Sequence, residues 1–205
     1  GEKAALCLTD PPYGIGETYG EIEDTVGNLE ELLPKIFPII RSVATITLLT
    51  PGNSHLWLYP KPNWVLAWFV EVGVGCNPWG FTYWNAIFAY GADPYLKLGK
   101  GSRPDAFVKT EASEKDTGHP TPKPLGVWTW LLNRGSTQTR DVVFDPFLGS
   151  GTTLIAAEQL GRRCFGCEIS EKYCDIVVAR FLRHVGPEKH PDLAEKYHAL
   201  LCKES

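Results

Sequence analysis

The 205-residue sequence predicts an α/β fold, with a mainly parallel sheet covered by helices on both faces. Short apolar runs of strand length alternate along the chain with segments whose apolar residues recur at helical spacing. Two of these runs, residues 4–9 and 142–144, lead directly into polar turns that contain proline or glycine. In open α/β sheets ligands bind beyond the carboxyl ends of the strands, so these two turns are where we expect the functional site.

The composition is that of a globular protein, with 43% hydrophobic residues, 21% charged residues and a formal net charge of −4. No apolar run approaches the roughly 20 residues of a membrane-spanning helix, and no secretory leader is recognisable. The six cysteines lack the density of a disulfide scaffold, so we expect reduced thiols and a cytoplasmic protein. The negative charge weighs mildly against nucleic-acid binding but leaves room for a local basic patch. The sequence contains no Met, and we expect the natural N-terminus to lie upstream of Gly1.

The first predicted elements lie on either side of the turn at residues 10–13. The apolar run 4–9 predicts a buried strand. A polar, Gly-rich loop follows at 14–27, and we interpret its acidic residues, Asp24 among them, as solvated surface. Apolar residues at helical spacing predict a helix over 29–41, capped by Asn28 or the residue before it. Two prolines inside this segment predict that the helix is short or kinked.

The middle of the chain is less regular. A β-branched run predicts a buried strand over 44–49, and apolar residues at helical spacing predict a helix over 64–72. The aromatic-rich segment 81–90 predicts one strand or two. Residues 91–122 show no period, and a loop of that length inside a compact domain is usually functional or disordered.

The last part of the chain returns to alternating strands and helices. We expect a helix at 123–132, a strand at 142–144, a helix at 152–160, a strand at 164–169, and helices at 171–184 and 191–201.

The first turn has the sequence Asp10-Pro11-Pro12-Tyr13. Neither proline can donate a backbone N–H, so the strand ladder stops here. A carboxylate, two carbonyl groups without a local partner and an aromatic ring are therefore expected together at the carboxyl end of the first strand.

The second turn, residues 144–153, lies between a predicted strand and a predicted helix. Gly149 and Gly151 let the backbone approach a ligand closely, and the free N–H groups of the helix start favour an anionic group. The next strand ends at Glu168, where an acid commonly binds ribose hydroxyls. This part predicts a nucleoside-containing ligand; NAD and ATP are disfavoured because the third glycine and a Gly-Lys-Ser/Thr sequence are missing.

Together these motifs resemble those of the S-adenosylmethionine-dependent DNA amino-methyltransferases of the N6-adenine and N4-cytosine type. Residues 10–13 are similar to their catalytic tetrapeptide and residues 144–153 to their cofactor loop. The sequence His-Pro-Thr-Pro-Lys-Pro at 119–124 resembles the segment that closes over the methionine end of the cofactor. The catalytic motif comes first, as in the circularly permuted β class.

The resemblance implies a Rossmann-like methyltransferase fold in which residues 1–205 form one catalytic domain. Residues 1–90 would be the catalytic half and 123–205 the cofactor-binding half. Residues 91–122 would be a loop or a DNA-recognition insert, although a short one. A family strand upstream of the catalytic motif is absent from this sequence.

For catalysis, the resemblance implies that the Asp10 carboxylate and the Pro11 carbonyl accept the hydrogens of an exocyclic amine. Two acceptors favour the nitrogen that gains positive charge as the methyl group arrives. Pro12 would keep the turn rigid, and Tyr13 would stack on a base that has left the duplex. For the cofactor, S-adenosylmethionine, the resemblance implies these binding residues: Asp145, Phe147, Gly149, Ser150, Gly151, Thr152, Glu168, Ile169, Thr121 and Lys123.

Asp at the first position of the tetrapeptide favours adenine N6, because the N4-cytosine enzymes more often have Ser there. The alternatives that stay open are an N4-cytosine DNA methyltransferase, an RNA methyltransferase and an inactive, methyltransferase-like nucleic-acid-binding module. The expected partner is double-stranded DNA. A homodimer is consistent with the class, as is a bacterial or phage origin in a restriction-modification setting.

No metal or membrane role is expected. Cys164 and Cys167 have the spacing of a metal or redox half-site, but no second pair follows, so we interpret both as core residues. We interpret most tryptophans of the first half in the same way, with one or two left to line a base pocket: Trp57, Trp64, Trp68, Trp79 and Trp84.

Overall fold

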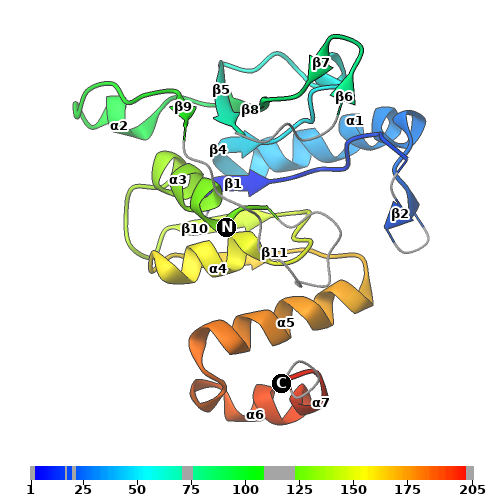
Figure 1. The fold of residues 1–205 in the computed structure, drawn as a ribbon. Helices are drawn as coiled ribbons and strands as arrows, with labels where there is room; N and C mark the ends of the chain where they lie inside the picture. Colours follow the sequence, from blue (N-terminus) through cyan, green and yellow to red (C-terminus); the bar gives the residue numbers. More distant parts are fainter. Residues whose placement is uncertain (1–2, 17, 20–21, 71–75, 109–122, 202–205) are drawn as a thin grey trace.

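The computed structural model describes residues 3–16, 18–19, 22–70, 76–108 and 123–201. It confirms the α/β fold: a mixed sheet carries helices on both of its faces (Figure 1). In spatial order its strands are β11 (Arg163–Gly166), β10 (Val142–Asp145), β1 (Ala4–Thr9), β4 (Ala44–Leu49), β8 (Trp84–Tyr90), β5 (Trp64–Phe69) and β9 (Ala106–Phe107).

The strand directions place the two turns side by side. Strands β11, β10, β1 and β4 run parallel, whereas β8 runs antiparallel to both β4 and β5. From β1 the chain crosses to β4 on one side, and later it enters β10 on the other side of β1. The carboxyl ends of β1 and β10 therefore form a topological switch point, where α/β sheets bind ligands.

Helices pack on the sheet as two layers. The bounds of the helices are α1 (Val26–Val43), α2 (Pro94–Lys97), α3 (Leu125–Gly135), α4 (Thr152–Gln159), α5 (Glu171–Val185), α6 (Pro191–Lys196) and α7 (His198–Leu201). One core cluster joins α3 and α4 to one face of the sheet, and Trp128 is its largest fully buried side chain. Two clusters join α1 to the other face, through Leu29, Leu33 and Ile40. Helices α5, α6 and α7 lie beyond the β11 edge (Figure 1).

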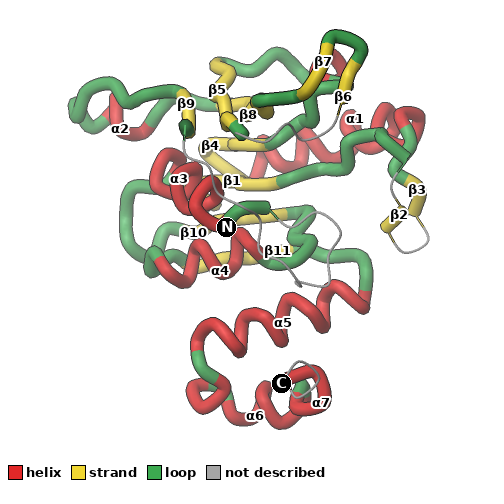
Figure 2. The backbone as a smooth tube through the Cα atoms, in the orientation of Figure 1, coloured by secondary structure: helices red, strands yellow, loops and turns green. Residues whose placement is uncertain are grey.

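Short elements stand out from these layers. Hairpins β2 (Thr18–Tyr19) with β3 (Ile22–Glu23) and β6 (Cys76–Asn77) with β7 (Gly80–Phe81) project from the sheet, as Figure 2 shows. Two 3₁₀ turns occur at Leu56–Leu58 and Pro187–Lys189. Among the described residues no helix is long and apolar enough to span a membrane.

Helix α1 is longer than predicted and has a different cap. It begins at Val26, after Thr25, whose hydroxyl accepts a hydrogen bond from the Asn28 N–H at 3.2 Å. Pro34 and Pro38 do not end it, because both lie on the exposed face, where the carbonyl groups that lose their helical partners can bind water.

The helix predicted over 64–72 is wrong for its described part, where residues 64–69 form strand β5. Six consecutive residues pair with β8, from Trp64 opposite Ala89 to Phe69 opposite Trp84. A nearly continuous apolar run fits either period, and here pairing with two neighbouring strands decides the outcome. Residues 71 and 72 lie outside the described part.

Smaller differences appear elsewhere. The 81–90 segment is one strand from Trp84, with Phe81 in the separate β6–β7 hairpin. The described part of 91–122 contains α2 and β9. Strand β11 ends at Gly166, before Glu168, and the last predicted helix is divided into α6 and α7 at Tyr197.

The interpretation of the tryptophans as core residues is wrong for most of them. Trp68 is buried, but Trp57 and Trp79 are 90% and 99% exposed, and Trp64 and Trp84 are also exposed. Trp57 lies in the 3₁₀ turn Leu56–Leu58 and Trp79 lies between β6 and β7, whereas Trp64 and Trp84 are the first residues of β5 and β8.

Candidate active site

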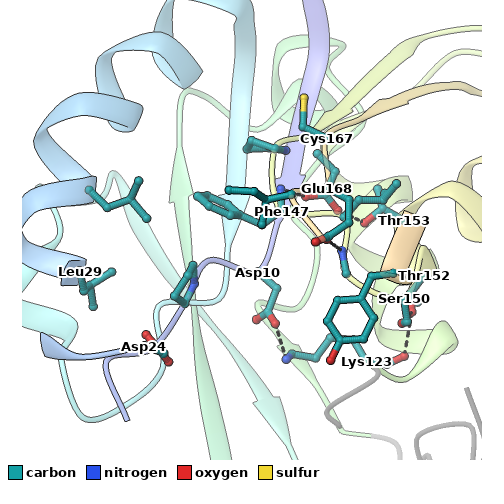
Figure 3. A pocket seen from close by; sticks show the side chains of 18 of the residues that line it. Asp10, Asp24, Leu29, Lys123, Phe147, Ser150, Thr152, Thr153, Cys167 and Glu168 are labelled. Carbon is teal, nitrogen blue, oxygen red and sulfur yellow. Dashed lines mark hydrogen bonds and ion pairs between the residues drawn. The ribbon is translucent and has the colours of Figure 1, made fainter. Parts of the chain in front are cut away.

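A cavity of about 650 Å³ lies at the carboxyl ends of β1 and β10 and joins the two predicted motifs. The predicted site residues that line it are Asp10, Pro12, Lys123, Asp145, Phe147, Gly149, Ser150, Thr152, Glu168 and Ile169. Figure 3 shows Asp10 near the middle, with Asp24 and Leu29 on one side and Glu168 and Thr153 on the other. Pro11, Tyr13 and Gly151 are not among the lining residues, and Thr121 lies outside the described residues.

Both oxygens of the Asp10 carboxylate are engaged. Its Oδ1 accepts hydrogen bonds from the Tyr13 hydroxyl and the Thr50 hydroxyl. Its Oδ2 forms an ion pair with the ammonium group of Lys123, whose side chain is only 13% exposed (Figure 3). The ammonium also lies 5.1 Å from the centre of the Tyr13 ring, within range of a cation–π interaction. Asp10 thus holds a cationic N–H donor above an aromatic face.

The turn that carries Asp10 is held by Asp24. This carboxylate accepts hydrogen bonds from the backbone N–H groups of Tyr13 at 2.9 Å, Gly14 at 2.6 Å and Ile15 at 3.4 Å. Gly14 has a φ of +70°, a conformation that glycine adopts without strain. Asp24 is 2% exposed, so its interpretation as a solvated loop residue is wrong.

The Tyr13 ring rests against a second glycine. Gly52 has a φ of +67°, and a Cβ added to it would lie 2.9 Å from Cγ of Tyr13. The loop after β4 therefore fixes the ring beneath Lys123, and any larger residue at position 52 would displace it.

Asp145 ties the two motifs together. Its carboxylate accepts hydrogen bonds from the hydroxyls of Thr9 at 2.6 Å and Thr153 at 2.5 Å, and from the Phe147 N–H at 3.1 Å. Burial raises the pKa of this carboxyl to about 6, although the three hydrogen bonds act to lower it. Asp145 therefore joins the ends of β1 and β10 to the first turn of α4, besides bordering the cavity.

The loop between β10 and α4 is held by the side chain of Glu168, which accepts hydrogen bonds from backbone N–H groups. One carboxylate oxygen accepts the Gly149 N–H at 2.8 Å, and the other accepts the Ser170 N–H at 2.9 Å. Gly151 has a φ of +81°, and a Cβ there would lie 3.0 Å from Val177 of α5. A carboxylate offers about four lone-pair positions, so Glu168 can still accept hydrogen bonds from a ligand.

Arg180 of α5 also holds this loop through hydrogen bonds. It was not predicted from the sequence. Its guanidinium is buried and donates to the Ser150 carbonyl at 2.8 Å and to the Thr152 hydroxyl at 3.2 Å. Thr50 was also missed, although it directly follows a predicted strand and precedes Pro51-Gly52. The rule that located Asp10, a polar residue at a strand's carboxyl end, would have found it.

Cys164 and Cys167, which have the spacing of a half-site, lie in different surroundings. Cys164 packs against the core, and burial raises the pKa of its thiol. Cys167 is exposed and lines the cavity, so its interpretation as a core residue is wrong. Within the described residues no group of three or more His, Cys, Asp or Glu side chains is arranged to hold a metal ion.

Known proteins resemble this chain in both sequence and structure. The family model for DNA methylases of the N6/N4 type matches residues 55–179, downstream of the Asp10 turn. The type II methyltransferase M.HpaI of Haemophilus parainfluenzae is 24% identical over 212 aligned positions, which cover 85% of this chain and 67% of M.HpaI.

Solved structures confirm the Rossmann-like methyltransferase fold. The cytosine-N4-specific PvuII DNA methyltransferase superposes with a TM-score of 0.68 and 16% identity, covering 96% of this chain and 86% of its own. The M1.HpyAVI–SAM complex gives a TM-score of 0.61 and 18% identity, with 90% of each chain covered. Because the family model spans more than half of its residues, this chain belongs to the N6/N4 family of DNA methylases.

Proposed function

We propose that this chain transfers a methyl group from S-adenosylmethionine to the exocyclic amine of a base in double-stranded DNA, with adenine N6 as the acceptor. Family membership supports the DNA amino-methyltransferase class. The observation that carries the proposal is the engagement of Asp10, which holds a cationic nitrogen over the Tyr13 ring inside the cavity that continues to the cofactor loop.

The residues around the cavity fit the cofactor. Its volume of about 650 Å³ lies within the usual range for small-molecule sites. Glu168 presents a carboxylate suited to ribose hydroxyls, and Phe147 and Ile169 add apolar surface suited to the adenine. Gly149, Ser150, Gly151 and Thr152 would border the methionine part. When bound, S-adenosylmethionine supplies the electrophilic methyl group; M1.HpyAVI, solved as its SAM complex, further supports this choice.

At the amine, this chain supplies acceptors. The lone pair of an exocyclic amine is delocalised into the base, so the nitrogen is a poor nucleophile. Asp10 Oδ2 and the Pro11 carbonyl accept hydrogen bonds from its two N–H groups and stabilise the positive charge that develops on the nitrogen. After the methyl group has moved from sulfur to nitrogen, one of these protons is released to solvent. Pro12 restricts the turn, and Tyr13 stacks on the base. In this structure the Lys123 ammonium pairs with Oδ2, so under this proposal the base would have to displace it.

Lys123 has a second partner in this scheme. The cofactor carries a carboxylate at its methionine end, and the Lys123 ammonium can pair with it after leaving Asp10. Thr121, which lies outside the described residues, is kept as a proposed cofactor-binding residue. Cofactor binding would then clear Asp10 for the base.

Residues 91–122 are the proposed DNA-recognition segment. Its described part is fixed to the body of the domain: Arg103 donates to the Asn133 carbonyl at 3.0 Å and to the Arg134 carbonyl at 2.9 Å, both in α3. If this part contacts DNA, it does so as a rigid platform. A homodimer would extend the surface available to the duplex.

A second candidate is methylation of cytosine N4, because the cytosine-N4-specific PvuII enzyme has the same fold. The two are separated by incubating the protein with unmethylated DNA and methyl-labelled cofactor and identifying the labelled nucleoside by mass spectrometry. We expect N6-methyladenine. Labelled N4-methylcytosine would change the base but keep the mechanism, and the absence of any labelled nucleoside would contradict the proposal.

A further inference from the structure

The hydroxyl of Thr50 donates a hydrogen bond to Oδ1 of Asp10. Thr50 directly follows β4, the strand beside β1, and its backbone N–H donates to the Thr9 carbonyl at 3.2 Å. Its side chain is 2% exposed. The residue is therefore anchored by its backbone next to the catalytic turn and buried against it.

The two carboxylate oxygens of Asp10 make different contacts. Tyr13 and Thr50 both donate to Oδ1, and two donors fill the two lone-pair positions of a carboxylate oxygen. Oδ2 faces Lys123, which is the only cation among the described residues that forms an ion pair with it. The second torsion of an aspartate side chain is soft, so without these donors the carboxylate could turn either oxygen toward the cavity.

We propose that Thr50 is a positioning residue for the methyl transfer: its hydroxyl, with that of Tyr13, holds Oδ1 so that Oδ2 is the oxygen presented to the exocyclic amine. This inference rests on the function proposed above. It adds a residue outside the Asp-Pro-Pro-Tyr motif, at the end of the neighbouring strand β4. Because Thr is β-branched, its own first torsion is stiff, which suits a fixed donor.

The chain contains a matched control in the same segment, on the strand that leads to Thr50. Thr47 is fully buried, and its hydroxyl has no hydrogen-bond partner among the residues described. Thr47→Val and Thr50→Val thus make the same change at two buried positions of one segment. Only the second removes a hydrogen bond to Asp10.

The kinetic test compares three variants in single-turnover methyl transfer at saturating cofactor and DNA. Thr50→Val should lower the rate roughly 10- to 100-fold, as expected for loss of a hydrogen bond to a charged group. Thr50→Ser should restore most of the rate, Thr47→Val should keep it, and the cofactor Kd should stay unchanged in all three. A wild-type rate in Thr50→Val, or an equal loss in Thr47→Val, would overturn the proposal.

A second measurement does not depend on activity. Thr50→Val should lower the urea midpoint of unfolding in the wild-type background but not in Asp10→Ala, because the partner is then missing. Equal shifts in both backgrounds would refute the contact. A wild-type protein that methylates no DNA would refute the proposed function instead, and the unfolding cycle would still decide whether Thr50 holds Asp10.

Discussion

The ammonium group of Lys123 forms an ion pair with the carboxylate of Asp10, a residue 113 positions earlier in the chain. It also lies over the ring of Tyr13. These are the groups that we propose hold the amine and the ring of the target base. Lys123 therefore pairs with the same carboxylate that we propose accepts the amine hydrogen, and we propose that it also reaches the cofactor.

Replacing Lys123 tests its role toward the cofactor. Lys123→Met should weaken cofactor binding about 10-fold or more, because a charge-assisted contact with the cofactor carboxylate is lost. Calorimetric titration measures the Kd. Lys35→Met is the matched control, since Lys35 also lines the cavity but is mostly exposed and paired with Glu31. An unchanged Kd in Lys123→Met would show that Lys123 does not contact the cofactor.

Tyr13 combines a hydroxyl bound to Asp10 with a ring that faces the cavity cation. Tyr13→Phe should lower kcat about 10-fold while leaving the KM for DNA nearly unchanged, because only the hydroxyl is lost. Tyr13→Ala should also raise that KM, since stacking on the base is lost. The two variants are compared in steady-state assays. If Tyr13→Phe raised KM as much as Tyr13→Ala, the ring would not be the group that binds the base.

Asp24 is the buried anchor of the turn that carries Asp10. Asp24→Asn places an amide donor against backbone N–H donors, so the free energy of unfolding should fall by about 2–3 kcal/mol. Urea unfolding measures the change. Glu23→Gln, at the exposed neighbouring position, should alter it by less than about 0.5 kcal/mol. Equal effects of the two substitutions would mean that the three N–H contacts contribute little.

Asp145 predicts a specific pH dependence of stability. Its pKa is raised to about 6 in the folded protein, above the ordinary value of a carboxyl, so the folded state binds the proton more tightly than the unfolded chain. The free energy of unfolding should therefore fall as pH rises from about 4 to 6, by up to roughly 3 kcal/mol from this group. Asp145→Asn should remove that fall. Parallel pH profiles for the two proteins in urea unfolding would contradict the assignment.

The positions of the two motifs could be predicted because each follows a short apolar run at a strand's end. Parallel strands bring such ends to one edge, so Asp10 and Glu168 were expected to face the same cavity. The expectation depended only on local pattern and on the geometry of an α/β sheet.

The contacts that complete the site could not be predicted in the same way. Asp24 lies in a polar loop, and only the folded turn shows that backbone N–H groups surround it. The partner of Lys123 depends on how α3 packs against β1, two elements far apart in sequence. The strand at 64–69 could not be told from a helix because its apolar residues are almost continuous. Only its pairing with the neighbouring strands shows that the segment is a strand.

The measurement that tests the central claim most directly is methyl transfer by Asp10→Asn. This change keeps the shape of the side chain but replaces one acceptor oxygen with a donor. In a single turnover with cofactor bound beforehand, we expect the rate to fall at least about 100-fold while the cofactor Kd changes little. A rate near that of the wild type would contradict the role of Asp10 as acceptor of the amine hydrogen.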